Sequence, residues 1–528
     1  MTDVDGDSQH LLLHSEPRPE AEGIPAGHGI WDDDWEDDSP KEACGVFGVY
    51  APGFPVSHLT YDGLHSLQHR GQESAGMAVS DGEKIWVDKD MGLVANVFNE
   101  RKLNALIGGL AVGHTRYSTT GSSVWDNAQP VFRSIVTADG LFEHEFALGH
   151  NGNLTNTAAL ADEAGMLPGM VGSDSEVMAE LISQSWARHG AAGTLETALM
   201  EVLPKLQGAF SLVLMDNERL VGVRDPNGFR PLCLGRLDGG WVLASETPAL
   251  DVVGAHVVRE LEPGELLVID AAGTRSARPF PVERIDPHLC LFEFVYFARP
   301  DALLYGKDVY GARVRMGELL ADQAPVDADM VMGVPETALA AAEGYARRSG
   351  IPYGQGLVKN RYIGRTFIAP DQLARDRGVQ RKLNPLRGNI AGKRLIVVDD
   401  SIVRGTTSRA IVRMLRDSGA AEVHFRIMSP PYKWPCFYGM DTGTKAQLLA
   451  ANMSVGEIKD YLGADSLAYI TIDNLKAAVA TPGAGFCDAC LTGNYPVEVP
   501  ISLSKHVLEV GPSPAVEVSP VPVVPGHG

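Results

Sequence analysis

A strand, a loop, a helix and a second strand follow one another between residues 395 and 428. LIVV (395–398) is a short, continuous apolar run, which is typical of a strand buried on both faces. A polar loop leads into SRAIVRMLRDSG (408–419), whose apolar residues recur at helical spacing before the terminating Gly419. EVHFRIM (422–428) is the next strand. Because parallel strands need a crossover connection, this order predicts a βαβ unit, and the chain after about residue 290 is expected to form an α/β domain with a parallel sheet.

The first half of the chain has a different pattern, with short apolar strands separated by turn sequences. Its clearest strands are Ala209–Met215, Leu220–Arg224, Leu232–Leu234 and Trp241–Ala244. DNER, DPNG and LDGG stand between them, which predicts an antiparallel meander. The spacing of leucine, isoleucine and valine predicts helices over Ser57–His69 and Glu176–Trp186. The part from Cys44 to about residue 275 is therefore expected to be an antiparallel α+β fold.

The two ends of the chain differ from both halves. Residues 1–43 carry 13 acidic residues but only Arg18 and Lys41 as basic ones, and the tail from about residue 505 is rich in proline and valine. Such segments bury little apolar surface, so both are expected to be disordered. The net charge of −22 disfavours nonspecific binding to nucleic acid. No apolar run approaches the roughly 20 residues that cross a bilayer, and the N-terminus has no secretory signal. We expect a cytoplasmic protein without a nucleic-acid or membrane partner.

VVDDSIVRGTTS (397–408) places two carboxylates, Asp399 and Asp400, directly after a buried strand. Doubly wound sheets bind their ligands at this edge. A helix begins next, and its amides and hydroxyls can bind an anion through Arg404, Gly405, Thr406, Thr407 and Ser408. Carboxylates beside an anion site suit a sugar phosphate, with Asp399 and Asp400 binding the ribose hydroxyls and a Mg²⁺. The alternative is a solvated Asp-Asp turn with an ordinary threonine cap.

This segment resembles the phosphoribosyl pyrophosphate (PRPP) loop of type I phosphoribosyltransferases. GLVKNRYIGRTFIAP (356–370) resembles their flexible loop in the form found in the amidophosphoribosyltransferase family. The resemblance implies that this loop closes over pyrophosphate and binds PRPP through Lys359, Arg361, Tyr362 and Arg365. It also implies one Mg²⁺ per subunit, held by Asp399, Asp400 and Thr337, the last of which lies in PETA (335–338). On composition alone, the stretch 356–370 could be a solvated basic loop.

Cys44 begins a glycine-rich strand, CGVFG, directly after the acidic leader. In the same family the first half is an N-terminal nucleophile (Ntn) glutaminase, whose cysteine must be the first residue of the mature chain. Its free α-amine then serves as the base, because a pKa of about 8 leaves the amine partly neutral at cellular pH. The resemblance therefore implies cleavage after Ala43 and Cys44 as the nucleophile, although this leader is longer than the short propeptides expected. On pattern alone, a buried strand cysteine is the simpler interpretation.

Three further motifs match glutaminases of this class and occur in the family's order: GHTRYST (113–119), GHNGNL (149–154) and GSDSE (172–176). They imply that Arg116 binds the α-carboxylate of glutamine and that Asp174 binds its α-ammonium. The Asn151 side chain and the Gly152 backbone N–H are implied as the oxyanion hole. HNGN taken alone could be a hairpin turn, since Asn-Gly is a common turn sequence.

Six cysteines are too few for a disulfide scaffold in a chain of 528 residues. CDAC (487–490) has the spacing of metal ligands or of a redox motif, but the thioredoxin-like context of a redox motif is not obvious around it. The resemblance implies that Cys290, Cys436, Cys487 and Cys490 hold one structural [4Fe–4S] cluster per subunit. On chemistry alone, zinc fits four thiolates equally well, and buried thiols without a metal are the remaining alternative. Cys233 is expected to be a core residue.

The resemblance runs from about residue 44 to residue 500. It implies a disordered leader (1–43), an Ntn glutaminase αββα sandwich (44–277), a type I phosphoribosyltransferase domain (278–480), a cluster-binding segment (481–504) and a disordered tail (505–528). The implied reaction takes glutamine, PRPP and water to 5-phosphoribosylamine, glutamate and pyrophosphate, with ammonia passing between two sites. AMP and GMP are the implied inhibitors, and the implied assembly is a homo-oligomer, either a tetramer or a dimer.

Two other functions fit parts of the sequence. A different Ntn-type glutamine amidotransferase, such as glucosamine-6-phosphate synthase, would share the first half but needs sugar-isomerase domains in place of VVDDSIVRGTTS. A PRPP-sensing regulator without catalysis would keep the phosphate loop and lose the nucleophile and the Mg²⁺ carboxylates, all of which are present.

Overall fold

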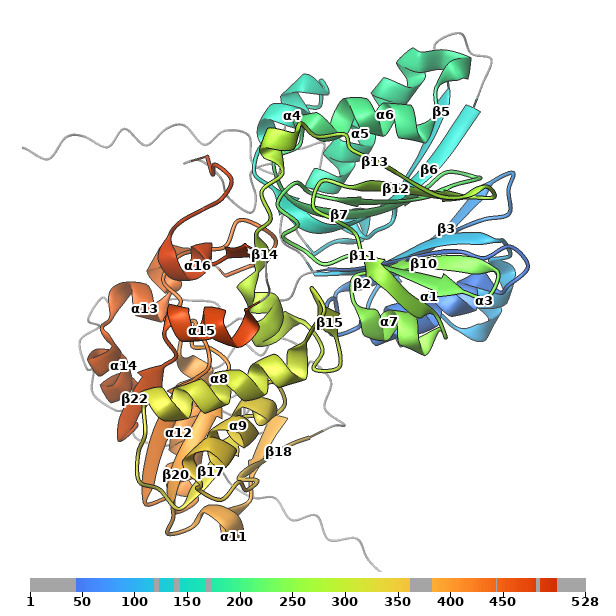
Figure 1. The fold of residues 1–528 in the computed structure, drawn as a ribbon. Coiled ribbons are helices and arrows are strands. Elements are labelled where there is room, and N and C mark those ends of the chain that lie inside the picture. Colours follow the sequence, from blue (N-terminus) through green and yellow to red (C-terminus); the bar gives the residue numbers. More distant parts are fainter. Residues whose placement is uncertain are drawn as a thin grey trace, which may run out of the picture. The chain divides into compact units, whose positions relative to one another are not determined.

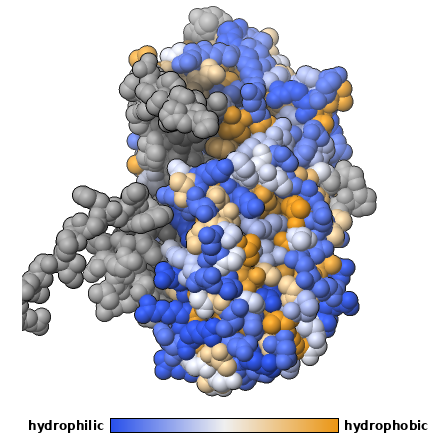
Figure 2. Space-filling model, turned by 90° about the vertical axis from the view of Figure 1, so that its left-hand side faces the viewer, coloured by the Kyte–Doolittle hydropathy of each residue, from blue (hydrophilic) through white to orange (hydrophobic). Residues whose placement is uncertain are grey.

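The computed structural model describes residues 44–117, 123–136, 143–167, 172–360, 382–442, 444–480 and 485–500 (Figure 1). The predicted leader and tail lie outside these residues. Within the described part of the chain, no helix is both long enough and apolar enough to cross a membrane. The face drawn in Figure 2 is predominantly hydrophilic and carries small hydrophobic patches.

The first half is a sandwich of two antiparallel sheets (Figure 1). The seven-stranded sheet has the order β11 (His256–Glu260), β9 (Cys233–Leu237), β10 (Gly240–Ala244), β1 (Gly45–Tyr50), β4 (Leu110–Arg116), β2 (Ser74–Ser80) and β3 (Ile85–Met91). The six-stranded sheet has the order β13 (Gly273–Ala277), β12 (Leu266–Asp270), β8 (Leu220–Arg224), β7 (Gly208–Met215), β6 (Glu143–Leu154) and β5 (Val131–Val136). Apolar side chains from both sheets, such as Val46, Val112 and Val213, form one buried core between them.

Helices cover the outer face of each sheet (Figure 1). The seven-stranded sheet is covered by α1 (Val56–Ser66), α2 (Val94–Val97), α3 (Glu100–Ala105) and α7 (Thr247–Val252). The six-stranded sheet is covered by α4 (Thr157–Glu163), α5 (Asp174–His189) and α6 (Leu195–Val202). The layers therefore have the predicted αββα order. The two predicted helices are present as α1 and α5, with ends shifted by a few residues.

The predicted meander is wrong in its connectivity. Strands β7 and β8 form a hairpin in one sheet, whereas β9 and β10 pair in the other. The sequence DPNG between β8 and β9 thus carries the chain across the sandwich and does not form a hairpin turn. The reason is Asp225, whose buried carboxylate accepts hydrogen bonds from the N–H groups of Phe210 (3.1 Å) and Asn227 (2.9 Å). A polar anchor inside the sandwich redirects the chain where surface turn residues would reverse it.

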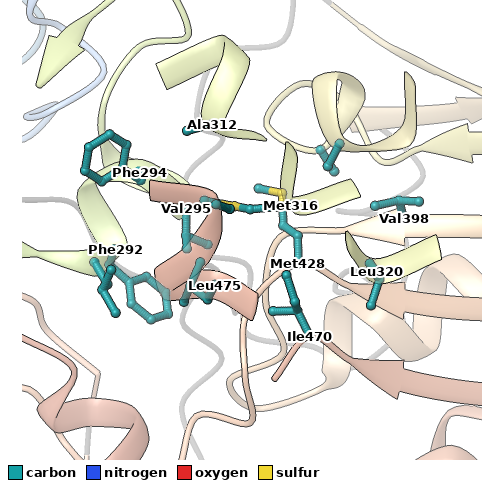
Figure 3. Packing of buried hydrophobic residues seen from close by; sticks show 14 of the residues in the cluster. Phe292, Phe294, Val295, Ala312, Met316, Leu320, Val398, Met428, Ile470 and Leu475 are labelled. Atoms are coloured by element: carbon teal, nitrogen blue, oxygen red, sulfur yellow. The ribbon is translucent and has the colours of Figure 1, made fainter. Parts of the chain in front are cut away.

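The second half contains a parallel sheet in the order β17 (Met330–Gly333), β20 (Arg394–Asp399), β21 (Glu422–Ile427) and β22 (Ser466–Tyr469). The predicted βαβ unit is confirmed, since α12 (Thr406–Asp417) connects β20 to β21. One face of the sheet is covered by α12 and α14 (Val455–Leu462). The other is covered by α8 (Val309–Gln323), α9 (Leu339–Ser349) and α15 (Ile472–Val479). Figure 3 shows Met316 of α8 and Val398 of β20 in this core.

Shorter elements complete the described chain. Three strand pairs are β14 (Leu289–Cys290) with β23 (Phe486–Cys487), β15 (Leu303–Leu304) with β16 (Lys307–Asp308), and β18 (Leu357–Lys359) with β19 (Leu383–Pro385). Short helices are α11 (Arg387–Ile390), α13 (Leu449–Asn452) and α16 (Ala489–Thr492), and a π-helical turn, η5, spans Glu293–Phe297. The 3-10 turns are η1 (Trp125–Asn127), η2 (Gly190–Ala192), η3 (Leu203–Lys205), η4 (Val282–Arg284) and η6 (Lys445–Gln447).

Candidate functional site

Cys44 lies immediately before β1, beside the end of β4. Its side chain is buried, and its Sγ donates to the carbonyl oxygen of Tyr117 at 3.3 Å. The N–H of Tyr117 in turn donates to Sγ at 3.4 Å. Burial raises the pKa of the Cys44 thiol to about 11, against the lowering effect of the Tyr117 hydrogen bond and of Arg116, while Glu73 and Asp174 raise it further. In the uncleaved chain, Cys44 is therefore a protonated thiol close to both predicted glutamine-binding residues.

Arg116 is the last residue of β4 and is almost entirely buried. Its Nη1 lies 3.7 Å from Oε2 of Glu73, in the short segment between α1 and β2. The sequence analysis did not identify Glu73. A carboxylate against Arg116 shows that this buried guanidinium accepts an anionic partner, which is the property required to bind an α-carboxylate.

Asp174 is the first residue of α5 and is also buried. Its Oδ2 accepts a hydrogen bond from the Leu154 N–H at 3.0 Å, and its Oδ1 lies 3.5 Å from Nδ1 of His150. Burial alone would raise the pKa of the Asp174 carboxyl, but His150 and the hydrogen bonds from its neighbours hold it below the ordinary value. Asp174 therefore remains an anion, as the binding of an ammonium group requires. His150 is a second partner that the sequence analysis missed, although it lies in GHNGNL.

Asn151 and Gly152 lie on β6, where they pair with Ser211 and Phe210 of β7. The Asn151 side chain is fully buried, and neither of its polar atoms has a hydrogen-bond partner among the described residues. A buried amide without partners costs about 1–3 kcal/mol, which indicates a ligand position. Gly152 has a φ of +154°, and an added Cβ would lie 2.0 Å from the Ala209 carbonyl oxygen. Only glycine fits at this position of the strand.

The carboxylates of the phosphate loop lie at the carboxyl edge of the parallel sheet. Asp399 ends β20, and its Oδ1 accepts the Asp400 N–H at 3.0 Å, while Ser401 donates to Asp400 at 2.7 Å. Burial raises the pKa of Asp400 to about 6, although Ser401 and the buried Arg313 lower it. Strand β17 pairs directly with β20, so the turn containing Thr337 follows the neighbouring strand end. The predicted oxygen ligands thus come from adjacent strand ends at one edge of the sheet.

The residues after Asp400 form the start of α12. Gly405 is the N-cap residue with a φ of +82°, and an added Cβ would lie 2.5 Å from the Leu449 side chain. Thr406, Thr407 and Ser408 form the first helical turn. Arg404 precedes this turn and is half-buried. A helix start of this kind can bind an anion, and anion binding by Arg404 to Ser408 stays a prediction.

Lys359 ends β18, and its Nζ lies 3.6 Å from Oε2 of Glu336 in the PETA turn. The base of the predicted flexible loop therefore lies beside the turn that contains Thr337. Arg361, Tyr362 and Arg365 lie outside the described residues.

Four cysteines, Cys290, Cys436, Cys487 and Cys490, line one cavity together with Arg230 and Tyr438. Strands β14 and β23 place Cys290 opposite Cys487. Burial raises the pKa of Cys290 to about 11 and those of Cys487 and Cys490 well above their ordinary value, and the thiols raise one another's pKa further. The described residues contain no group of three or more His, Cys, Asp or Glu side chains that could hold a metal ion. The four thiols line one shared cavity.

A buried ion network that the sequence analysis missed joins the two halves. Arg70, which follows α1, donates to both Glu246 and Glu293, and all three side chains are fully buried. Arg230 reaches Glu293 from the other side, with Nη1 3.2 Å from Oε1. Glu293 begins the π-helical turn, whose carbonyl oxygen at Phe294 accepts from Arg313 at 2.9 Å. The residues of this network lie far apart in the sequence, between Arg70 and Arg313, so their ion pairs could not be predicted from the sequence alone.

Comparison with known proteins identifies both halves. A glutamine amidotransferase domain matches residues 114–252, and a phosphoribosyl transferase domain matches residues 316–428. The amidophosphoribosyltransferase of Mycobacterium bovis is 53% identical over 486 residues, which cover 89% of this chain and 90% of that protein. The chain belongs to the amidophosphoribosyltransferase family.

Solved structures of similar proteins agree with this assignment. A structure described as the allosteric regulatory enzyme of purine biosynthesis is 43% identical, with a TM-score of 0.80, and covers 89% of this chain and 99% of that one. The glutamine PRPP amidotransferase of B. subtilis, complexed with ADP and GMP, is 43% identical with a TM-score of 0.79, and covers 88% and 99%. The predicted family, its glutaminase and phosphoribosyltransferase folds, and its nature as an enzyme are therefore confirmed.

Proposed function

We propose that this amidophosphoribosyltransferase takes glutamine, PRPP and water to 5-phosphoribosylamine, glutamate and pyrophosphate, which opens purine synthesis. The observation that carries the proposal is the position of Cys44, buried close to Arg116 and Asp174, in a chain that also contains the Asp399–Ser408 phosphate loop. Neither a lone glutaminase nor a PRPP-binding regulator needs both.

In the first half, cleavage after Ala43 would give Cys44 a free α-amine. This amine accepts the thiol proton while the sulfur attacks the amide carbon of glutamine, and the proton then passes to the departing ammonia. Arg116 and Asp174 bind the two charged groups of the substrate. The Asn151 amide and the Gly152 N–H stabilise the oxyanion, and water hydrolyses the resulting thioester to glutamate.

In the second half, the α12 start and Arg404 to Ser408 would bind the 5-phosphate, with Asp399 and Asp400 near the ribose hydroxyls. Lys359, Arg361, Tyr362 and Arg365 would bind the pyrophosphate group. Ammonia from the first site displaces pyrophosphate at C1 of PRPP. Oxygen donors at adjacent strand ends suit a Mg²⁺, with Thr337, Asp399 and Asp400 as its ligands. When bound, the ion supplies positive charge beside the pyrophosphate.

For the cysteine-lined cavity we propose a [4Fe–4S] cluster, one per subunit. Four thiolates around one tetrahedral zinc ion would converge at about 2.3 Å from the metal. The four thiols that line the cavity would suit either group, and the resemblance to the family favours the cluster. When bound, the cluster supplies the positive charge that keeps the four buried thiolates ionised. Protein purified without oxygen is expected to contain iron and sulfide, and zinc without sulfide would contradict this assignment.

Four further properties belong to the same proposal. The domain limits are 44–277, 278–480 and 481–504, and the mature enzyme is a cytoplasmic homo-oligomer, either a tetramer or a dimer. AMP and GMP act as inhibitors, an assignment supported by the B. subtilis enzyme solved with ADP and GMP.

Intact mass and pyrophosphate release test the proposal together. The mature chain is expected to begin at Cys44 and to release pyrophosphate from PRPP with either glutamine or ammonia. An active enzyme that still begins at Met1 would contradict the Cys44 chemistry. A mature enzyme that hydrolyses glutamine but never consumes PRPP would contradict the overall reaction.

A further inference from the structure

One loop joins the cysteine-lined cavity to the candidate oxyanion hole. This 436–440 loop (CFYGM) begins with Cys436 in the cavity wall. The next residue, Phe437, accepts a hydrogen bond through its carbonyl oxygen from Nδ2 of Asn153, at 3.1 Å. Asn153 directly follows Gly152 on β6. The loop therefore contacts the glutaminase half at the strand that contains the predicted oxyanion donors.

Gly439 of this loop packs against Gly152 of β6. It has a φ of +100°, and an added Cβ would lie 3.1 Å from both Cα and the carbonyl carbon of Gly152. The same Cβ would lie 3.3 Å from Nη2 of Arg230. Gly152 has its own φ of +154°, and a Cβ added there would lie 2.0 Å from the Ala209 carbonyl oxygen. Backbone thus packs on backbone, and the position of Gly152 depends on where Gly439 lies.

The glutaminase half fixes the loop through Phe229 and Arg230. The carbonyl oxygen of Tyr438 accepts from Nε and Nη2 of Arg230, at 3.2 and 3.0 Å. The Phe229 ring stacks on the Tyr438 ring, with centroids 4.4 Å apart and planes 16° apart. Arg230 is buried and is itself held by Glu293. Displacement of the loop would therefore break buried contacts on both sides.

We propose that the 436–440 loop positions the oxyanion hole of the glutaminase site. The inference rests on the proposed function, because it assigns Gly152 to the glutaminase reaction. Its consequence is selective, since the transferase site is built from other residues, at the ends of β17 and β20. Loop displacement should impair the use of glutamine and spare the use of ammonia.

The substitution Gly439→Ala tests the contact, because the added methyl group would press on Gly152. In the mature holoenzyme, we expect kcat with glutamine to fall about 10- to 100-fold, while KM for glutamine changes little because Arg116 and Asp174 are untouched. Ammonia-dependent synthesis and the iron content are expected to match the wild type. Gly463→Ala is the matched control, since Gly463 also has a positive φ (+75°) but has open space around its Cβ position.

Equal losses with glutamine and ammonia in Gly439→Ala, or no loss with glutamine, would overturn the inference. A wild-type enzyme that cannot use glutamine at all would instead overturn the proposed function, so the two failures are distinct.

Discussion

The two candidate sites of this enzyme are built in opposite ways. The glutaminase residues Cys44, Arg116, Asp174 and Asn151 are each at most 5% exposed and lie inside a sandwich with sheets and helices on both sides. The transferase residues follow strand ends, and several of them, such as Lys359 and Thr406, are half-buried or exposed. The first site is fixed by the surrounding fold, whereas the second is assembled from turns. We therefore expect substitutions in the two sites to change enzymatic activity and thermal stability to different extents.

The largest expected effect is the loss of glutamine use in Cys44→Ala. Without the sulfur, no thioester can form, so glutamine-dependent synthesis should fall to background. Ammonia-dependent synthesis should remain within about twofold of the wild type, because the second site needs no cysteine nucleophile. Pyrophosphate release with each nitrogen donor is the measurement. Cys233→Ala, at a buried core cysteine of the same half, should keep glutamine use. If Cys44→Ala loses both activities, the two halves have been assigned incorrectly.

Asp400→Asn is expected to affect both nitrogen donors alike. Removing one carboxylate from the proposed ribose and Mg²⁺ site should lower synthesis with glutamine and with ammonia about 1,000-fold. Thermal stability should not fall, since burial already disfavours the charged form of Asp400. Asp417→Asn, an exposed carboxylate at the end of α12, is the control. Selective loss of glutamine use alone would contradict the placement of Asp400 in the transferase site.

Asn151→Ala should separate activity from stability within the buried site. Loss of one oxyanion donor should lower kcat with glutamine by about 100- to 1,000-fold. The melting temperature should be unchanged or higher, because the substitution removes a buried amide that has no partner among the described residues. Asn156→Ala should instead keep the activity with glutamine and lower the melting temperature. Its amide donates to the Lys205 carbonyl oxygen and accepts from the Gln207 N–H, so the substitution breaks two hydrogen bonds. A destabilised Asn151→Ala would mean that the amide has a structural partner.

The smallest expected effect is a pH-dependent loss of stability through His114. Its Nε2 donates to the His150 carbonyl oxygen at 2.9 Å, and burial lowers its pKa to about 3. The unfolded chain takes up a proton below its pKa of about 6.5 and the folded chain does not, so stability falls as pH drops from about 6.5 toward 3.

Urea unfolding at pH 7 and pH 5 measures this loss. Between pH 7 and pH 5, the free energy of unfolding of the wild type should fall by up to about 2 kcal/mol more than that of His114→Gln. His256→Gln, at an exposed position of β11, should behave as the wild type does. Identical pH dependence in all three proteins would show that His114 is protonated in the folded state.

Local patterns predicted the second half better than the first. The strand, phosphate loop and helix from Leu395 to Asp417 were readable because each element is specified by adjacent residues. The crossing between the two sheets at Asp225 could not be predicted, because the hydrogen bond between Asp225 and the distant Phe210 determines the course of the chain there. Glu73, His150 and Arg313 were missed for the same reason, since their roles come from partners distant in the chain. The glutaminase motif residues were found by family resemblance and not by periodicity.

The parallel pairing of β14 with β23 has a consequence for how the protein is made. Cys290 emerges from the ribosome long before Cys487, its neighbour across the pair. At translation rates of about 5–20 residues per second, the wait is roughly 10–40 s. During that interval the sandwich can fold, but the cysteine-lined cavity has only part of its wall. Closure of the cavity is thus among the last events of biogenesis, and a nascent chain truncated before residue 485 would present an unfinished thiol pocket to any chaperone or iron donor it meets.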